Sequence, residues 1–281
     1  MSDTEIEGVS ADATEASPIV IYFATQLKRL RGDKGWTQEQ LGKRIRYTAG
    51  MVGMVETAKR VPSEKFVLTC DKVLDAGGML ADLWPAITRD SYHDWFRPFV
   101  ELEAEAVSIR EFEVQVVPGL FQTEDYARAV LSAAWPPPAP EDVERQLAAR
   151  LERQKILDRT NPTAPLLWVV LEESVLCRPV GGRDVMVDQL KHLLEMAQRS
   201  HVRLQILPFS KGAHAAMDGA FTLLETGNRD RMLYTERPGS GQVTSDADEV
   251  AKCDQRMSAL IGLALSPEES IDQLATRIGE T

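Results

Sequence analysis

The sequence predicts a two-domain protein of class α + α/β, with five helices over residues 18–88 and a mixed α/β domain over residues 91–281. Apolar residues recur at helical spacing through the first range, which predicts helices without strands. In the second range amphipathic segments alternate with short apolar runs, as in domains where helices cover a sheet. The 281 residues and the 43% hydrophobic content are sufficient for two buried cores.

The net charge of −11 is unevenly distributed along the chain. Residues 20–66 hold ten Lys or Arg against four Asp or Glu, whereas residues 91–281 hold twenty bases against thirty acids. A basic domain joined to an acidic one is the pattern expected when one face meets phosphate and the rest must avoid it. The acidic, aperiodic residues 1–17 are predicted to form a disordered tail.

Several classes of protein are disfavoured. No apolar run approaches the roughly 20 residues that span a bilayer, and the acidic N-terminus is unlike a signal peptide, so we expect a cytoplasmic protein without a membrane partner. Cys70, Cys177 and Cys253 form no CxxC pair and are predicted to be buried free thiols. Neither a metal-ligand spacing nor a catalytic cluster is visible, which predicts a protein that is not an enzyme and that uses no metal or cofactor.

The first predicted helix covers residues 19–31 and is amphipathic. Two short helices follow, beginning at Thr37 and Thr48. Thr37 can accept the backbone N–H of Gln40, whose side chain can reach back to form a capping box. Both short helices carry apolar residues that the first helix can cover: Leu41, Ile45, Val52 and Val55. A fourth helix begins after Ser63, and a short fifth one covers residues 79–84.

Residues 37–62 resemble the helix-turn-helix of the Cro/phage-repressor (XRE) family without a gap. The matching residues are Thr37-Gln38-Glu39, Leu41, Thr48, Val52, Val55-Glu56 and Arg60-x-Pro62. The resemblance implies that the second helix of the motif, about residues 48–58, lies in the major groove of double-stranded DNA. It also implies a phosphate contact by Gln38 and a structural ion pair between Arg31 and Glu56.

Two departures from the family change what the motif is expected to do. Arg46 occupies the turn position that usually holds glycine, so the turn is expected to be strained or rearranged. Ala49, Gly50 and Gly53 stand where polar side chains often read base edges, and such small residues cannot make bidentate hydrogen bonds. Specificity is therefore expected from DNA shape and from contacts with thymine methyl groups by three side chains: Thr48, Met51 and Met54. Phosphate contacts are predicted for five bases: Lys43, Arg44, Arg46, Lys59 and Arg60.

The second domain is predicted to alternate strands with helices. The predicted strands are residues 108–117, 166–171, 202–207, 220–224 and 231–235. The predicted helices are one marked by Trp95, Phe99 and Leu102, and residues 123–134, 141–157, 184–199, 246–265 and 268–278. In the long charged helix, Arg145, Arg150 and Arg153 alternate with glutamates, which is typical of a solvated helix face.

Most of this domain resembles the C-terminal domain that follows XRE-type motifs in many actinobacterial regulators, including the WhiJ-like developmental regulators. The matching residues are Val117-Pro118-Gly119-Leu120-Phe121-Gln122-Thr123, Tyr126-Ala127-Arg128, Arg153-Gln154, Leu171-Glu172-Glu173, Pro179-Val180-Gly181-Gly182, Gln189-Leu190, Leu207-Pro208-Phe209, Gly212-x-His214 and Phe221-Thr222-Leu223. The resemblance implies regulation of transcription, often beside a gene for a small partner protein, and sometimes an antitoxin-like role. It supplies no ligand and no catalytic residue.

Two features of this domain allow a functional or a structural interpretation. His214 lies in a loop rich in glycine and alanine, where it can line a ligand pocket, respond to pH, or be an idle polar residue. Glu172-Glu173 can be a paired-carboxylate site or metal ligands, but an acidic start to the next helix is the favoured interpretation because no complementary His or Asp cluster accompanies it.

The sequence thus predicts a transcriptional regulator, more readily a repressor than an activator, that binds DNA as a homodimer. Its second domain is expected to dimerise or to receive a signal from a ligand or a small protein encoded nearby. The alternative is an antitoxin-like interaction module that sequesters such a partner and binds DNA weakly. The exposed apolar residues of the last two helices are candidates for a dimer seam.

Overall fold

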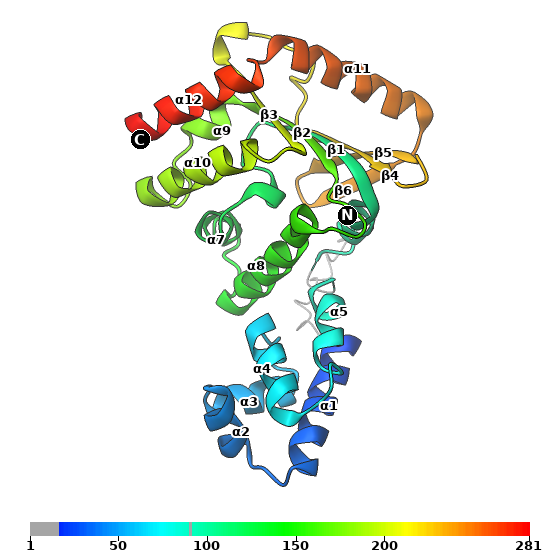
Figure 1. The fold of residues 1–281 in the computed structure, drawn as a ribbon, viewed down its shortest axis with the longest axis vertical. Coiled ribbons are helices and arrows are strands. Elements are labelled where there is room, and N and C mark those ends of the chain that lie inside the picture. The colour runs from blue at the N-terminus through cyan, green and yellow to red at the C-terminus, as the bar shows by residue number, and fades with distance from the viewer. Residues whose placement is uncertain (1–16, 90–91) are drawn as a thin grey trace, which may run out of the picture. The chain divides into compact units, whose positions relative to one another are not determined.

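The computed structural model describes residues 17–89 and 92–281 and divides the chain into two compact units, residues 1–90 and 91–281 (Figure 1). The predicted acidic tail lies outside the described residues, apart from Ser17. The N-terminal unit is helical and the C-terminal unit is built on a sheet, as the sequence predicts. The class α + α/β is therefore confirmed.

Five α-helices make up the described part of the N-terminal unit. They are α1 (Pro18–Asp33), α2 (Gln38–Ile45), α3 (Ala49–Glu56), α4 (Glu64–Leu74) and α5 (Trp84–Arg89). Side-chain caps fix where the helices begin, since the Ser17 and Ser63 hydroxyls accept the N–H groups of Val20 and Phe66. The apolar edges of α1 to α4 meet in one core, whose fully buried members include Phe23, Leu27, Leu41, Val52 and Phe66.

The fifth helix begins later than predicted, because a buried carboxylate holds the preceding turn. Asp71 accepts N–H groups from Gly78, Leu80 and Ala81, at 2.9, 2.8 and 3.1 Å. These bonds satisfy backbone donors that would otherwise be buried without a partner. A 3₁₀ turn at Ala81–Leu83 follows, and α5 extends to Arg89.

The C-terminal unit contains a six-stranded mixed sheet with the order β3-β2-β1-β4-β5-β6. The strands are β1 (Ala106–Glu113), β2 (Leu166–Glu172), β3 (Val202–Leu207), β4 (Phe221–Thr226), β5 (Arg231–Arg237) and β6 (Ser240–Thr244). Strands β3, β2 and β1 are parallel, and β4, β5 and β6 continue the sheet in antiparallel pairs. Strand β6 was not predicted, because Ser240-Gly-Gln-Val-Thr lacks apolar alternation and pairs only at the sheet edge, after a turn at Gly239.

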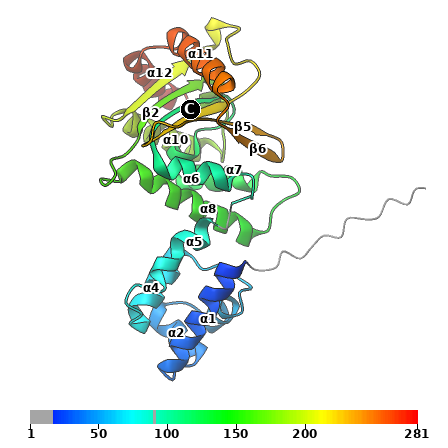
Figure 2. The ribbon, with the colours of Figure 1, turned by 90° about the vertical axis from the view of Figure 1, so that its right-hand side faces the viewer.

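Helices cover both faces of this sheet. They are α6 (Arg97–Glu105), α7 (Glu124–Ser132), α8 (Pro140–Gln154), α9 (Glu173–Cys177), α10 (Arg183–Ala197), α11 (Ala247–Leu263) and α12 (Pro267–Glu280). Helix α11 packs on one face through Val250, Met257 and Leu260. The helices α6, α7, α8 and α10 lie on the other face (Figure 2). The short helix α9 was not predicted as a separate element.

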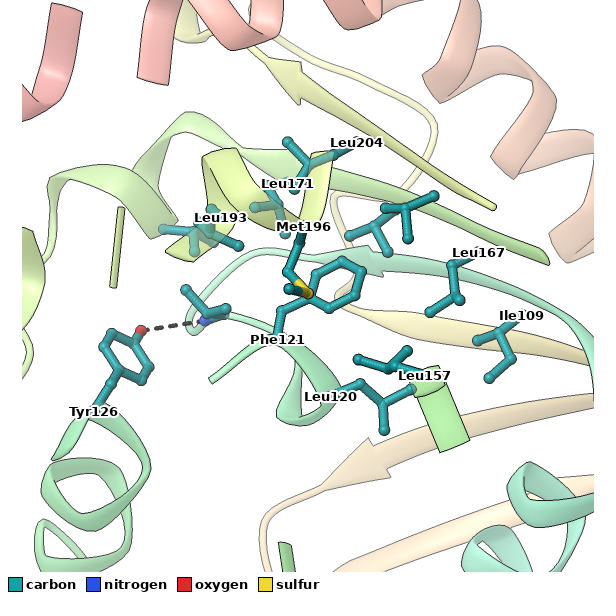
Figure 3. Close-up of a cluster of buried hydrophobic side chains, with 14 of the residues drawn as sticks. Ile109, Leu120, Phe121, Tyr126, Leu157, Leu167, Leu171, Leu193, Met196 and Leu204 are labelled. Atoms are coloured by element: carbon teal, nitrogen blue, oxygen red, sulfur yellow. Dashed lines mark hydrogen bonds between the residues drawn. The ribbon is translucent and has the colours of Figure 1, made fainter. Parts of the chain in front are cut away.

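The larger core lies between the sheet and the helices of the second face (Figure 3). Leu167, Leu171 and Leu204 from the strands meet Leu193 and Met196 from α10 there. The fully buried Tyr126 of α7 adds a polar contact, since its hydroxyl accepts the backbone N–H of Val117 at 3.1 Å. The loop between β1 and α7 is thereby fixed against the core.

Two sequence expectations about single side chains are wrong. Cys177 is exposed and receives a hydrogen bond from Arg277, whereas Cys70 and Cys253 are buried free thiols as predicted. Arg150 and Arg153 are not on a solvated face: the Arg153 side chain is only 11% exposed and pairs with Glu103 of α6, and Arg150 donates to the Gln122 side chain at 2.6 Å. Across residues 17–89 and 92–281, no helix is long and apolar enough to cross a membrane.

Candidate nucleic-acid interface

Helices α2 and α3 form the candidate interface, and hydrogen-bonded caps define where both begin. The Thr37 hydroxyl accepts the N–H of Gln40 at 3.1 Å, and the Gln40 side chain accepts the N–H of Thr37 at 2.9 Å. These two bonds complete a capping box. The Thr48 hydroxyl accepts the N–H of Met51 at 3.1 Å and starts α3. The polar N-terminus of α3 is thus built by its own sequence.

The turn between the helices keeps a left-handed residue although that residue is not glycine. Arg46 has φ 62° and ψ 42°, and the next residue, Tyr47, donates its N–H to the Gly42 carbonyl at 2.9 Å. An arginine in this region is strained by contact of its Cβ with the backbone. The sequence therefore anticipates the strain, and the turn is retained rather than rearranged.

Replacing Arg46 by glycine is expected to raise the free energy of unfolding of this unit by about 0.5–1 kcal/mol, the relief of left-handed strain less the added entropy of an unfolded glycine. Hydrogen exchange of the amides in α2 and α3 measures the change. Asp75→Gly is the matched control, because Asp75 ends α4 at φ 57° and aspartate tolerates this conformation better. An equal gain in the two variants would contradict the argument.

A buried ion pair ties α1 to the end of α3. Arg31 Nε and Nη2 donate to the two carboxylate oxygens of Glu56, at 2.5 and 2.9 Å. The Glu56 side chain is fully buried, and Gln38 Nε2 also donates to it at 2.8 Å. The Gln38 side chain, which is predicted to contact a phosphate, is thus already held in place by Glu56. One carboxylate sets the relative positions of the first three helices.

The bases predicted to contact phosphate fall into two groups. Lys43 pairs with Glu39 at 2.8 Å, and the Arg44 guanidinium stacks 4.2 Å from the centre of the Trp36 ring. The second group, Arg46, Lys59 and Arg60, has no side-chain hydrogen bond or ion pair to any described residue. An unpaired base can meet a phosphate without first breaking a protein contact, so this second group carries the stronger prediction.

The surface of helix α3 carries no long polar side chain. Thr48, Gly50 and Met54 are exposed, whereas Ala49, Met51 and Gly53 are half-buried. A methyl group added at Gly50 would meet no heavy atom closer than 4.0 Å. Because this surface lacks long polar side chains, it offers apolar contacts and the Thr48 hydroxyl to a groove, but no bidentate donor.

His214 has a structural environment. Its side chain is 4% exposed, its Nδ1 accepts the Ala216 N–H at 3.3 Å, and its ring packs edge-on against Phe112. Its Nε2 lies 3.6 Å from a carboxylate oxygen of Glu172, which is the N-cap residue of α9. Glu173 opens that helix and accepts the Phe209 N–H at 2.8 Å. These contacts agree with the structural interpretation of both acids.

Comparisons with known proteins agree with this division of the chain. Residues 23–84 match a family described as a helix-turn-helix domain, which supports a DNA-binding regulator of transcription. Residues 96–276 match the family described as a domain of unknown function (DUF5753). This match covers more than half of the chain, so the protein belongs to that family. The chain matches no curated protein and no solved structure at a significant level.

Two residues of the interface were not anticipated from the sequence. Trp36 supports Arg44 through its ring, and Gly42 allows α2 to approach the backbone of Tyr47 closely. An unexplained glycine inside a short amphipathic helix is the signal that would have identified Gly42, since such a glycine usually has a packing reason. No comparable signal marks Trp36, because its contact depends on the turn that precedes α2.

Proposed function

We propose that the protein is a sequence-specific transcriptional repressor that inserts α3 into the major groove of double-stranded DNA. The observation that carries the proposal is the set of three exposed or half-buried bases, Arg46, Lys59 and Arg60, flanking α3 and unpaired among the described residues. They lie just before and just after α3, in which the small residues Ala49, Gly50 and Gly53 allow the helix to approach base edges closely. The helix-turn-helix match supports DNA as the partner.

In this proposal the chain acts as a homodimer, as repressors of this kind do, on a pseudo-palindrome with half-sites about 34–36 Å apart. The C-terminal unit would provide the dimer contact and receive a signal, in the manner of the WhiJ-like regulators that it resembles. Binding by a monomer to an asymmetric site would contradict the dimer.

The first experiment is binding of the full chain to its own promoter region and to scrambled DNA of equal length across a salt series. Tight binding with a specificity ratio of about 10³ or more supports the proposal. Equal and steeply salt-dependent binding to both DNAs would mean that α3 does not read sequence.

Removing the unpaired bases after α3 is expected to weaken binding to every DNA sequence alike. Lys59→Ala and Arg60→Ala should each lower the slope of log affinity against log salt by about 0.9, because each releases one fewer counterion. Fluorescence anisotropy with the promoter and with scrambled DNA measures both slopes. Lys72→Ala, which removes an exposed base of α4 outside the motif, is the control and should leave them unchanged. Loss of affinity for the promoter alone would indicate base contacts instead.

The small residues of α3 favour a second candidate, an antitoxin-like module that sequesters a small protein and binds DNA weakly. The two functions differ in what a change at Ala49, Gly50 and Gly53 does. Polar side chains placed there should alter the preferred operator if α3 reads DNA, and should alter nothing if the C-terminal unit does the recognition.

A further inference from the structure

A cavity of about 400 Å³ lies inside the C-terminal unit, within the range of small-molecule sites. One wall is the sheet face formed by β1, β4 and β5, and helices α6 and α8 form the opposite wall. The loop that follows β1 closes one side, and the loop before β4 closes another. The cavity belongs to one compact unit and is therefore defined by the fold of that unit alone.

Strand alternation places two acids of β1 in this cavity. Glu111 and Glu113 share a face of the strand with Ile109, whereas Phe112 points to the opposite core. Strand β1 is interior, since it pairs with β2 on one side and with β4 on the other. Interior positions under helices are normally apolar, so two acids there are an exception that needs a reason.

Most charged groups of the cavity have partners. Arg153 Nε lies 2.8 Å from Glu103 Oε2, and Arg150 Nη1 donates to the Gln122 side chain at 2.6 Å. The Tyr234 hydroxyl donates to Glu236 at 2.6 Å on β5. Asp218, at the loop before β4, pairs with Arg256 at 2.8 Å.

Glu111 and Glu113 differ from these groups. Over the described part of the chain, no side chain forms an ion pair or a hydrogen bond with the Glu111 or Glu113 carboxylate. Both residues are half-buried by accessible surface, and the cavity that they line is the place from which a counter-charge can reach them. Partly buried charges without a partner are destabilising.

The charge balance of the cavity decides the sign of the group that fits it. Since Arg153 is committed to Glu103, one guanidinium, Arg150, remains against three carboxylates: Glu111, Glu113 and Glu236. A bound anion would add a like charge to this excess, whereas a cation would neutralise it. Aromatic rings of Phe96, Phe99 and Tyr234 line the same space: Phe99 and Tyr234 stack on each other, and Phe96 carries the Arg153 guanidinium over its ring, so they offer apolar contact to a ligand's body.

We propose that this cavity binds an organic cation, an amine or guanidinium compound with a small apolar body, whose charged group lies between Glu111 and Glu113. The aromatic side chains of α6 and β5 hold the apolar body, and the exposed Glu236 lines the same cavity. The inference deepens the proposed function, because it names the chemical class of the signal, but binding to the cavity is measured without DNA.

The protonation of the two acids gives the binding a pH dependence. Burial raises the pKa of Glu111 to about 8, with Glu103 and Glu236 adding to the rise and Arg153 opposing it. Burial and the charges of Glu111 and Glu236 likewise raise the pKa of Glu113. A cation binds the ionised carboxylates. Between pH 6 and 8 its affinity should therefore increase about tenfold per pH unit for each carboxyl group that loses a proton on binding.

The test is calorimetric titration of the full chain with three probes of one shape: phenethylamine, 2-phenylethanol and 3-phenylpropionate. Putrescine and arginine methyl ester extend the cation series. At least one cation should bind at pH 8 at least tenfold more tightly than the neutral and anionic probes. Glu111→Gln and Glu113→Gln should each reduce that affinity at least tenfold, whereas Glu195→Gln on the surface of α10 should not.

Thermal unfolding distinguishes a loss of cation binding from a failure of the variant to fold. In the free protein the raised pKa means that ionising Glu111 destabilises the native state, so stability falls as pH rises towards 8. Glu111→Gln should therefore raise Tm at pH 8 by about 2–4 °C for each kcal/mol gained, and should flatten the pH dependence. A variant that is more stable and yet no longer binds cations would support a binding role rather than a structural one.

Three results would overturn the inference. They are the absence of binding by every cation at 10 mM, equal binding of the neutral probe, and binding of Mg²⁺ or Ca²⁺ in place of the amines. Promoter binding, measured on the same preparation, separates the two proposals. Cation binding without promoter binding would contradict the repressor, and promoter binding without cation binding would contradict this site.

Discussion

Replacing Glu56 by alanine is expected to lower the free energy of unfolding of the N-terminal unit by about 3 kcal/mol. The carboxylate is fully buried, whereas the side chain of its partner Arg31 is 14% exposed. Its removal leaves the guanidinium with only the Trp36 carbonyl, at 2.5 Å, and frees Gln38 from its 2.8 Å bond. A buried pair that loses one partner destabilises a fold far more than the intact pair stabilises it, because the remaining charge stays desolvated.

Hydrogen exchange measured by mass spectrometry is the suitable readout, because denaturation of a two-unit chain need not be two-state. Amides of α1 and α3 should lose protection in the Glu56→Ala variant, and those of β1 and β2 should keep it. Glu39→Ala is the control, since the Glu39 and Lys43 side chains are 68% and 74% exposed and such pairs contribute at most about 1 kcal/mol. Equal losses of exchange protection in both variants would show that burial does not determine how much an ion pair contributes to stability.

The local structure of the first unit follows from the sequence because its signals are short-range. Thr37, Thr48 and Ser63 each cap the helix that was predicted to begin there, and every such bond spans three residues. Apolar spacing identifies which edges are buried for the same reason. The delayed start of α5 was missed, because it depends on Asp71 reaching backbone groups up to ten residues away.

The cavity of the second unit could not be predicted, because its parts come from distant strands and helices. Alternation along β1 puts Glu111 and Glu113 on one face, but the sequence does not say which face meets α8. The order β3-β2-β1-β4-β5-β6 makes β1 interior, and this position results from pairings between segments about 60 to 120 residues apart. Arg153 was placed on a solvated face because spacing alone cannot show that α6 covers it.

Replacing Gly42 by alanine is expected to destabilise the protein, although helix propensity alone predicts that it stabilises it. An alanine inside α2 should stabilise the helix by up to about 1 kcal/mol on propensity alone. At this position, however, the added Cβ would lie 2.6 Å from the Tyr47 carbonyl oxygen and 3.2 Å from the Thr48 carbonyl carbon. Both atoms belong to the backbone of the turn that positions α3, so neither can move without displacing that helix.

We expect Gly42→Ala to lower the free energy of unfolding by about 2–3 kcal/mol, as overpacked sites do, and to weaken promoter binding as α3 shifts. Gly50→Ala is the matched control, because its Cβ meets nothing closer than 4.0 Å and should stabilise α3 by about 0.5–1 kcal/mol. Exchange protection of α3 and promoter affinity measure the two effects separately. If both alanines stabilised the unit equally, the close approach of α2 to the turn would be wrong, and Gly42 would have no role in positioning α3.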